Sequence, residues 1–130
     1  MKTKLLDHTF DHVEIVDGFL TIESLLGIHQ AISEECRDIM RVKNHDYTSG
    51  SKDPFANFRM SETIGIPAEL AILIRSMDKF QRIRTFVEKG TLRVENEGVD
   101  DAIMDVINYM VILYGMVTEK RLKGISSNAA

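Results

Sequence analysis

The segment from Val99 to Arg121 constrains the fold of this chain more than any other. Between residues 103 and 117 its side chains are apolar except for Asp105, Asn108 and the hydroxyl groups of two tyrosines. A helix with apolar residues in every direction around its axis is usually buried on more than one face. The segment therefore predicts a central helix that other helices, or other copies of the chain, must cover.

Two more long helices are predicted from apolar residues spaced three or four apart. The first runs from Ser24 to about Asn44. The second runs from Pro67 to Lys89 and stops at Gly90, which places a proline in the first turn and a glycine just past the end. With the apolar segment they make a bundle of three long helices.

Two shorter elements have turn or cap signals. Asp53 and Pro54 predict the start of a short helix that extends to about Thr63, because Asp is a good N-cap and Pro suits the first turn. The dipeptide Asp17-Gly18 lies between two β-rich runs and predicts a small hairpin. The fold class expected is mainly α, a helical bundle of three long helices plus one short helix, with a small N-terminal β-hairpin. The expected divisions are a hairpin extension, an all-α domain and a flexible tail, at residues 1–23, 24–123 and 124–130.

Length, charge and cysteine content exclude several classes of protein function. With 130 residues the chain has the length of one domain, and its net charge of −4 disfavours binding to a nucleic-acid polymer. The single cysteine, Cys36, makes neither an internal disulfide nor a thiolate metal site on its own. The N-terminus lacks the apolar core of a signal peptide, and no uninterrupted apolar run reaches membrane length. We expect a cytoplasmic protein that binds no membrane.

Acidic residues on two predicted helices are candidate metal ligands. Asp101, Asp105 and Asn108 share one stripe of the apolar helix. An unpaired carboxylate in such surroundings costs several kcal/mol, so the stripe either meets a metal, Lys or Arg, or faces water while the rest of the helix packs in an oligomer. Glu35 and Asp38 lie on one side of the first helix, and such a pair can share a divalent cation with acids from another helix.

The second long helix carries charges of both signs on one face. Arg75, Asp78, Lys79 and Arg82 are spaced three, four and seven apart. Arg and Lys suit phosphate oxygens and Asp suits Mg²⁺, so this face fits a phosphate chain with its metal. The alternative is a surface face of ion pairs such as Asp78 with Arg82.

Residues 44–66 have little regular structure in the sequence pattern and are rich in aromatics. Tyr47, Phe55 and Phe58 can stack on a nucleobase, and Asn57 can bond to its edge. The alternative is that Phe55 and Phe58 form the core face of the short helix.

Four blocks of sequence, in their order and spacing, resemble a small protein family common in bacteriophages. That family is a nucleotide-modification-associated domain, similar to the MazG-like all-α NTP pyrophosphatases. The resemblance covers roughly residues 30–118 and leaves out the hairpin. The blocks are Lys43–Tyr47, Asn57–Arg59, Ile72–Lys79 with Arg82–Arg84, and Val99–Tyr109.

The resemblance implies helices around a Mg²⁺ cluster that binds the phosphates of a nucleotide and activates a water to release pyrophosphate. Two expected acids are missing, since Gln81 and Ala102 stand in their places. The implied catalytic residues are Asp78, Asp105 and Glu35. The implied metal ligands are Glu35, Asp38, Asp78, Asp101 and Asp105. The implied substrate-binding residues are Lys43, His45, Asp46, Tyr47, Asn57, Phe58, Arg75, Lys79, Arg82, Asn108 and Tyr109.

Three functions are compatible with these features. The leading hypothesis is a Mg²⁺-dependent nucleoside triphosphate pyrophosphohydrolase of phage nucleotide metabolism. The alternative is a non-catalytic protein that sequesters a nucleotide or a nucleotide-derived signal, which the changes at Gln81 and Ala102 favour. A third is a structural helical oligomer with no small ligand. We also expect a homo-oligomer through the long helices, because apolar surface is added on the side away from the stripe of Ile103, Met110 and Val117. The residues on that side are Met104, Val111, Ile112 and Gly115.

Overall fold

The computed structural model describes residues 3–5, 8–10, 13–48, 50–90 and 98–124 of the chain. Its four helices are α1 (Ile22–Thr48), the 3-10 helix η1 (Phe58–Ile64), α2 (Ala68–Lys89) and α3 (Val99–Leu122). Two antiparallel hairpins precede them, β1 (Thr3–Leu5) with β2 (His8–Phe10), and β3 (Ile15–Val16) with β4 (Phe19–Leu20). The predicted mainly α fold is confirmed, and β3 and β4 are the predicted hairpin. The β1–β2 hairpin was not predicted.

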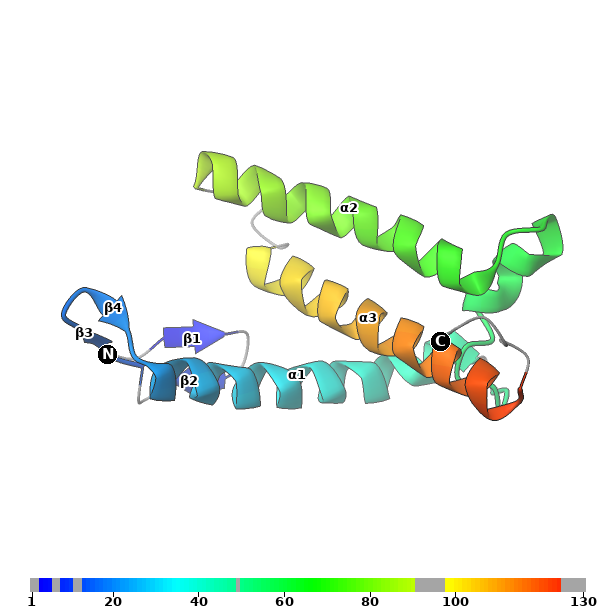
Figure 1. Cartoon of the computed structure of the whole chain (residues 1–130), viewed down its shortest axis with the longest axis horizontal. Helices are drawn as coiled ribbons and strands as arrows, with labels where there is room; N and C mark the ends of the chain where they lie inside the picture. The colour runs from blue at the N-terminus through cyan, green and yellow to red at the C-terminus, as the bar shows by residue number, and fades with distance from the viewer. Residues whose placement is uncertain (1–2, 6–7, 11–12, 49, 91–97, 125–130) are drawn as a thin grey trace.

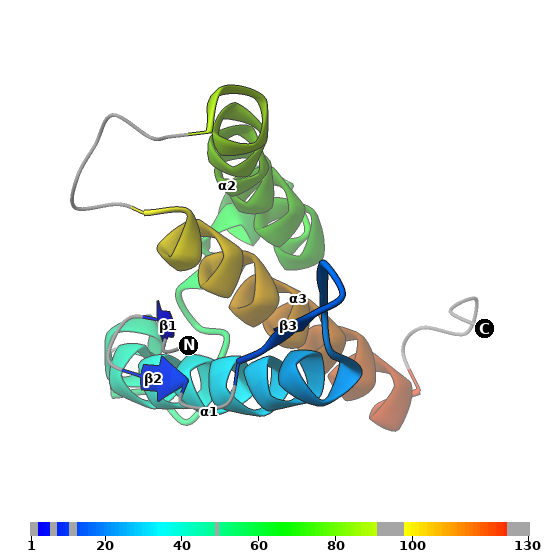
Figure 2. The same ribbon diagram turned by 90° about the vertical axis from the view of Figure 1, so that its left-hand side faces the viewer.

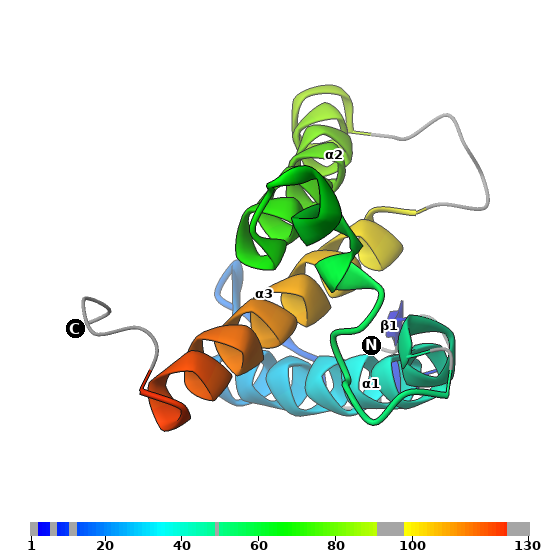
Figure 3. The ribbon, with the colours of Figure 1, turned by 90° about the vertical axis from the view of Figure 1, so that its right-hand side faces the viewer.

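The long helices are arranged with α3 in the middle (Figure 1). α2 runs antiparallel along one side of α3, and α1 crosses its other side, as the end-on views in Figures 2 and 3 show. The main core lies where η1, α2 and α3 meet, around Phe58, Ile72 and Met116. A smaller contact joins α1 to α3, where Asn108 Nδ2 donates to the backbone oxygen of Cys36 at 3.1 Å.

α2 has the ends that its proline and glycine predict, and α3 runs from the predicted start at Val99 to Leu122, one residue past the predicted end. Pro67 is the N-cap of α2, and Gly90 ends that helix with a φ of 76°. α1 differs, because it continues one turn past the predicted end at Asn44. Its last residue, Thr48, is buried. Packing at this end outweighs the weak helix propensity of Asn and Asp, which suggested a loop.

The short helix ends at the predicted glycine but begins later than predicted, because its N-cap is Asn57 and not Asp53, and it has 3-10 geometry. Asp53 Oδ1 accepts a hydrogen bond from the backbone N–H of Phe55 at 3.0 Å, as an N-cap side chain does. Residues 54–57 then form turns, and the 3-10 helix begins at Phe58. Gly65, with a φ of 83°, ends it.

α3 departs from the expectation that no segment suits a membrane. Its most apolar stretch has a mean hydropathy of 1.3, which is enough to cross a membrane by length and composition alone. A core helix that is mostly buried has the same length and composition, whereas 28% of this stretch of α3 is buried within the chain. The position of α3 between α1 and α2 agrees with the predicted role as the central helix (Figure 2).

Candidate functional site

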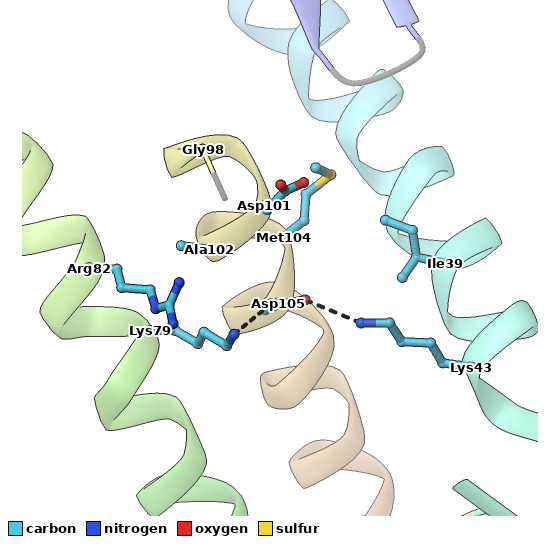
Figure 4. A pocket seen from close by; sticks show the side chains of 9 residues that line it. All are labelled: Ile39, Lys43, Lys79, Arg82, Gly98, Asp101, Ala102, Met104 and Asp105. Atoms are coloured by element: carbon cyan, nitrogen blue, oxygen red, sulfur yellow. Dashed lines mark ion pairs between the residues drawn. The ribbon is translucent and has the colours of Figure 1, made fainter. Parts of the chain in front are cut away.

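A pocket of about 330 Å³ lies where the first turns of α3 face α1 and α2 (Figure 4). Three cationic side chains and two carboxylates line it, together with small and apolar groups. The lining residues are Ile39 and Lys43 of α1, Lys79 and Arg82 of α2, and Gly98, Asp101, Ala102, Met104 and Asp105 at the start of α3. The pocket thus gathers charges that the sequence places on three separate helices.

Asp105 is the centre of the pocket's charge arrangement. Lys79 Nζ lies 3.1 Å from its Oδ2 atom, and Lys43 Nζ lies 3.7 Å from its Oδ1 atom. The two lysines approach from opposite helices (Figure 4). This carboxylate therefore has the cations that its apolar helix requires, and it links α1, α2 and α3 through charge.

Asp78 does not join this group. Its side chain is 69% exposed, and its Oδ2 atom lies 3.5 Å from Arg82 Nε, one helical turn away. Consecutive helical residues point about 100° apart, so Lys79 faces the pocket while Asp78 faces outward. The predicted catalytic position of Asp78 is thus outside the pocket lining, and its pairing with Arg82 matches the surface alternative.

Glu35 and Asp38 line a neighbouring surface depression with Val42. Ile39 and Lys43 separate the two hollows, since they line both. Within the described part of the chain, no three His, Cys, Asp or Glu side chains are grouped closely enough to hold a metal. The predicted set of five acids is therefore not assembled in one chain, and Asp101 with Asp105 is the pair on the pocket.

The start of α3 and the adjoining part of α1 carry a concentration of negative charge. Burial, and then the charge of Asp101, raise the pKa of the Asp100 carboxyl. Burial, and then the charges of Glu35 and Asp105, raise the pKa of the Cys36 thiol. Cys36 thus stays protonated and is a core residue rather than a nucleophile.

Several predicted substrate-binding residues belong to the core beside the pocket. Phe58 is 1% exposed. Arg75 is exposed and outside the pocket lining, and its guanidinium lies 4.9 Å from the centre of the Phe58 ring. Asn108 is buried in its bond to α1, and Tyr109 packs against the core cluster. Asn57, next to Phe58, is half-buried and outside the pocket lining. For Phe58 the core alternative describes the structure, because the short helix turns this ring inward.

The segment Lys43–Tyr47 lies on the last turns of α1 and not in a loop. Lys43 reaches the pocket. The side chains of His45, Asp46 and Tyr47 are outside the part that the structure describes, and their roles stay predictions. Sequence reasoning did not identify Ile39 and Met104 as pocket walls, since nothing in the pattern separates them from core residues.

The fold and the pocket define a class, a small all-α domain with a mixed-charge pocket between its long helices. Residues 43–115, more than half of the chain, match the nucleotide modification associated domain 1 family. The chain belongs to this family. No curated protein and no solved structure matches it.

Proposed function

We propose that this protein binds a nucleotide by its phosphate groups, with Lys43, Lys79 and Arg82 as the phosphate ligands. The observation that carries the proposal is the approach of Lys43 and Lys79 to one point from opposite helices. Cations outnumber carboxylates on the pocket wall, and charge-assisted hydrogen bonds from Lys and Arg are well suited to phosphate. The family's description, a domain associated with nucleotide modification, supports the same ligand class.

The size of the pocket bears on which part of the nucleotide would lie inside it. Small-molecule pockets range from about 300 to 1,000 Å³, so this one is at the lower end. At about 330 Å³ it takes a phosphate chain more readily than a whole nucleotide. The sugar and base then extend out of the pocket, and the base contributes less to affinity than the phosphates.

Asp101 and Asp105 fit a Mg²⁺ ion at this site. They are one helical turn apart on the same wall of the pocket. Mg²⁺ is commonly held by one or two carboxylates together with the phosphates of a ligand. When bound it would neutralise phosphate charge, and Lys43 and Lys79 would then bind phosphate oxygens in place of Asp105.

A second candidate is Mg²⁺-dependent pyrophosphohydrolysis in the cytoplasm, as in the MazG-like enzymes of phage nucleotide metabolism. The carboxylate pair on the pocket favours it. The outward position of Asp78 and the separate depression of Glu35 and Asp38 favour binding without hydrolysis. A protein of that kind would sequester a nucleotide or a nucleotide-derived signal.

A calorimetric titration of NTPs and dNTPs with Mg²⁺ into matched lysine variants tests the proposal. Lys79→Met should weaken all nucleotides alike by about 10- to 100-fold, since it removes one charge-assisted donor. Lys89→Met is the control, because Lys89 is an exposed lysine at the end of the same helix. Equal affinities for the two variants would contradict the proposal. Pyrophosphate release by the wild-type protein separates hydrolysis from binding.

A further inference from the structure

The main core fixes α1 less firmly than it fixes the other helices. The buried residues of that core come from η1, α2 and α3, and they are Phe58, Ala68, Ile72, Ile112 and Met116. α1 adds Met40, which is partly buried against the cluster. The position of α1 therefore depends more strongly on its separate contact with α3.

Two buried hydrogen bonds join α1 to α3 at Cys36. Asn108 Nδ2 donates to the backbone oxygen of Cys36 at 3.1 Å, and the Cys36 thiol donates to the backbone oxygen of Met104 at 3.8 Å. Asn108, Cys36 and Met104 are all less than 9% exposed. A buried amide that loses its partner costs free energy, whereas apolar contacts between helices tolerate sliding. A single buried Asn between helices can thus select one register, and Asn108 selects one placement of α1 on α3.

We propose that Asn108 is a positioning residue that holds Lys43 in place for phosphate, an inference that rests on the proposed function. Lys43 follows Cys36 by seven residues, which is two turns along the same face of α1. Asp105, which Lys43 Nζ approaches to 3.7 Å, precedes Asn108 by one turn in α3. The Asn108–Cys36 bond therefore fixes the two helices close to where Lys43 enters the pocket.

Lys79 does not depend on this bond. It belongs to α2, which is packed on α3 through the main core, and its Nζ atom lies 3.1 Å from Asp105 Oδ2. A shift of α1 would move Lys43 and leave Lys79 where it is. Asn108 itself is outside the pocket lining, and its amide is bonded to Cys36. It thus acts on the ligand through Lys43 and not by direct contact.

A double-mutant cycle on the affinity for inorganic tripolyphosphate, measured by calorimetry, tests the proposal. Asn108→Leu should weaken binding about 10-fold, as Lys43→Met should. Both changes remove the same phosphate contact, so the double variant should bind no more weakly than Lys43→Met alone. In the Lys79→Met background, in contrast, Asn108→Leu should still weaken binding by its full factor.

Ser76→Ala is the matched control. Ser76 is a fully buried polar residue, but its hydroxyl bonds within its own helix, to the backbone oxygen of Ile72 at 2.9 Å. Its loss should leave the affinity unchanged in either lysine background. Circular dichroism checks that each variant keeps its helix content, and Asn108→Ala takes the place of Asn108→Leu if the larger side chain disturbs the fold.

Two kinds of failure are distinguishable. If neither Lys43→Met nor Lys79→Met changes the affinity, the proposed function is wrong and this inference falls with it. If Lys79→Met weakens binding, the proposed function survives, and the positioning role is overturned by unchanged affinity in Asn108→Leu or Lys43→Met. It is also overturned if Asn108→Leu multiplies the loss of Lys43→Met as fully as that of Lys79→Met, which would indicate direct contact with the ligand, or if Ser76→Ala weakens binding equally.

Discussion

At the residue scale, the position of Asp105 between two lysines gives it two roles. In the structure it holds Lys43 and Lys79 in place through its two carboxylate oxygens. In the proposed complex the lysines bind phosphate oxygens in place of Asp105. The Asp105 carboxylate can then bind a metal together with Asp101. Nucleotide and Mg²⁺ should therefore bind cooperatively, each favouring the rearranged state.

Asp105→Asn separates these roles, because it removes a charge that repels phosphate but attracts the metal. The variant should lose the Mg²⁺ dependence of nucleotide binding, while its metal-free affinity for inorganic tripolyphosphate should be no weaker than that of the wild type. Calorimetric titrations with Mg²⁺ or with EDTA measure both quantities. Mg²⁺-dependent binding that survives the substitution would place the metal elsewhere.

At the residue level, the sequence left several partners open for the carboxylates of the apolar helix, and the structure selects one of them for Asp105. Carboxylates on the apolar helix needed cations nearby, and Asp105 has two. The sequence was less informative for the charged face of α2, because i, i+3, i+4 and i+7 spacing covers a wide arc of a helix. The residues of that face are Arg75, Asp78, Lys79 and Arg82. The sequence does not show which part of that arc faces the pocket.

At the element scale, Arg59 fastens η1 to the end of α3. Its Nη2 atom lies 2.7 Å from Glu119 Oε1, and its guanidinium also pairs with Asp53. The hydrogen bonds that Asp53 accepts from Arg59 lower the pKa of the Asp53 carboxyl. All three side chains are partly buried, so these contacts are less screened than surface pairs.

Arg59→Met should lower the free energy of unfolding by about 1–2 kcal/mol, measured by urea denaturation. Arg84→Met should cost at most about 0.5 kcal/mol, since the Arg84–Glu88 pair is exposed. A carboxyl whose pKa is lowered by folding stabilises the protein above its unfolded value, and that contribution is lost as pH falls through the folded value. Wild-type stability should thus fall below about pH 4, and less steeply in Arg59→Met. Equal losses in the two arginine variants would count against this connection.

Two helical glycines differ in what surrounds them. A Cβ atom at Gly27 in α1 would meet nothing within 4 Å, while one at Gly115 in α3 would lie 3.0 Å from Cζ of the Phe55 ring. Gly27→Ala should therefore stabilise the protein by about 0.5–1 kcal/mol through helix propensity. Gly115→Ala should show no such gain, because the ring must shift. Thermal unfolding of both variants checks this, and equal gains would mean that Phe55 does not pack closely on α3.

Element ends were predictable where a residue type determines the backbone. Pro67 and Gly90 bound α2 within one residue of the expected limits, since proline restricts φ and glycine adopts positive φ readily. The end of α1 was not predictable, because Asn44 and Asp46 favour loops locally and packing of the helix end decides otherwise.

At the scale of the whole molecule, the chain is an open arrangement in which one central helix has partners on two sides only. Its mainly α class was readable from the period of the apolar residues. The exposed apolar surface could not be predicted in the same way, since Met104 and Ile112, expected to be uncovered, are buried within the chain, whereas Val111 is exposed as expected. Which apolar face remains exposed depends on the crossing of α1 over α3, which no local pattern specifies.

The central claim, that phosphate groups are what the pocket recognises, is tested most directly by a competition titration on the wild-type protein. Inorganic tripolyphosphate should displace a bound nucleoside triphosphate, and the matching nucleoside without phosphates should not. Binding of the nucleoside as tight as that of its triphosphate, or no displacement by tripolyphosphate, would contradict the account.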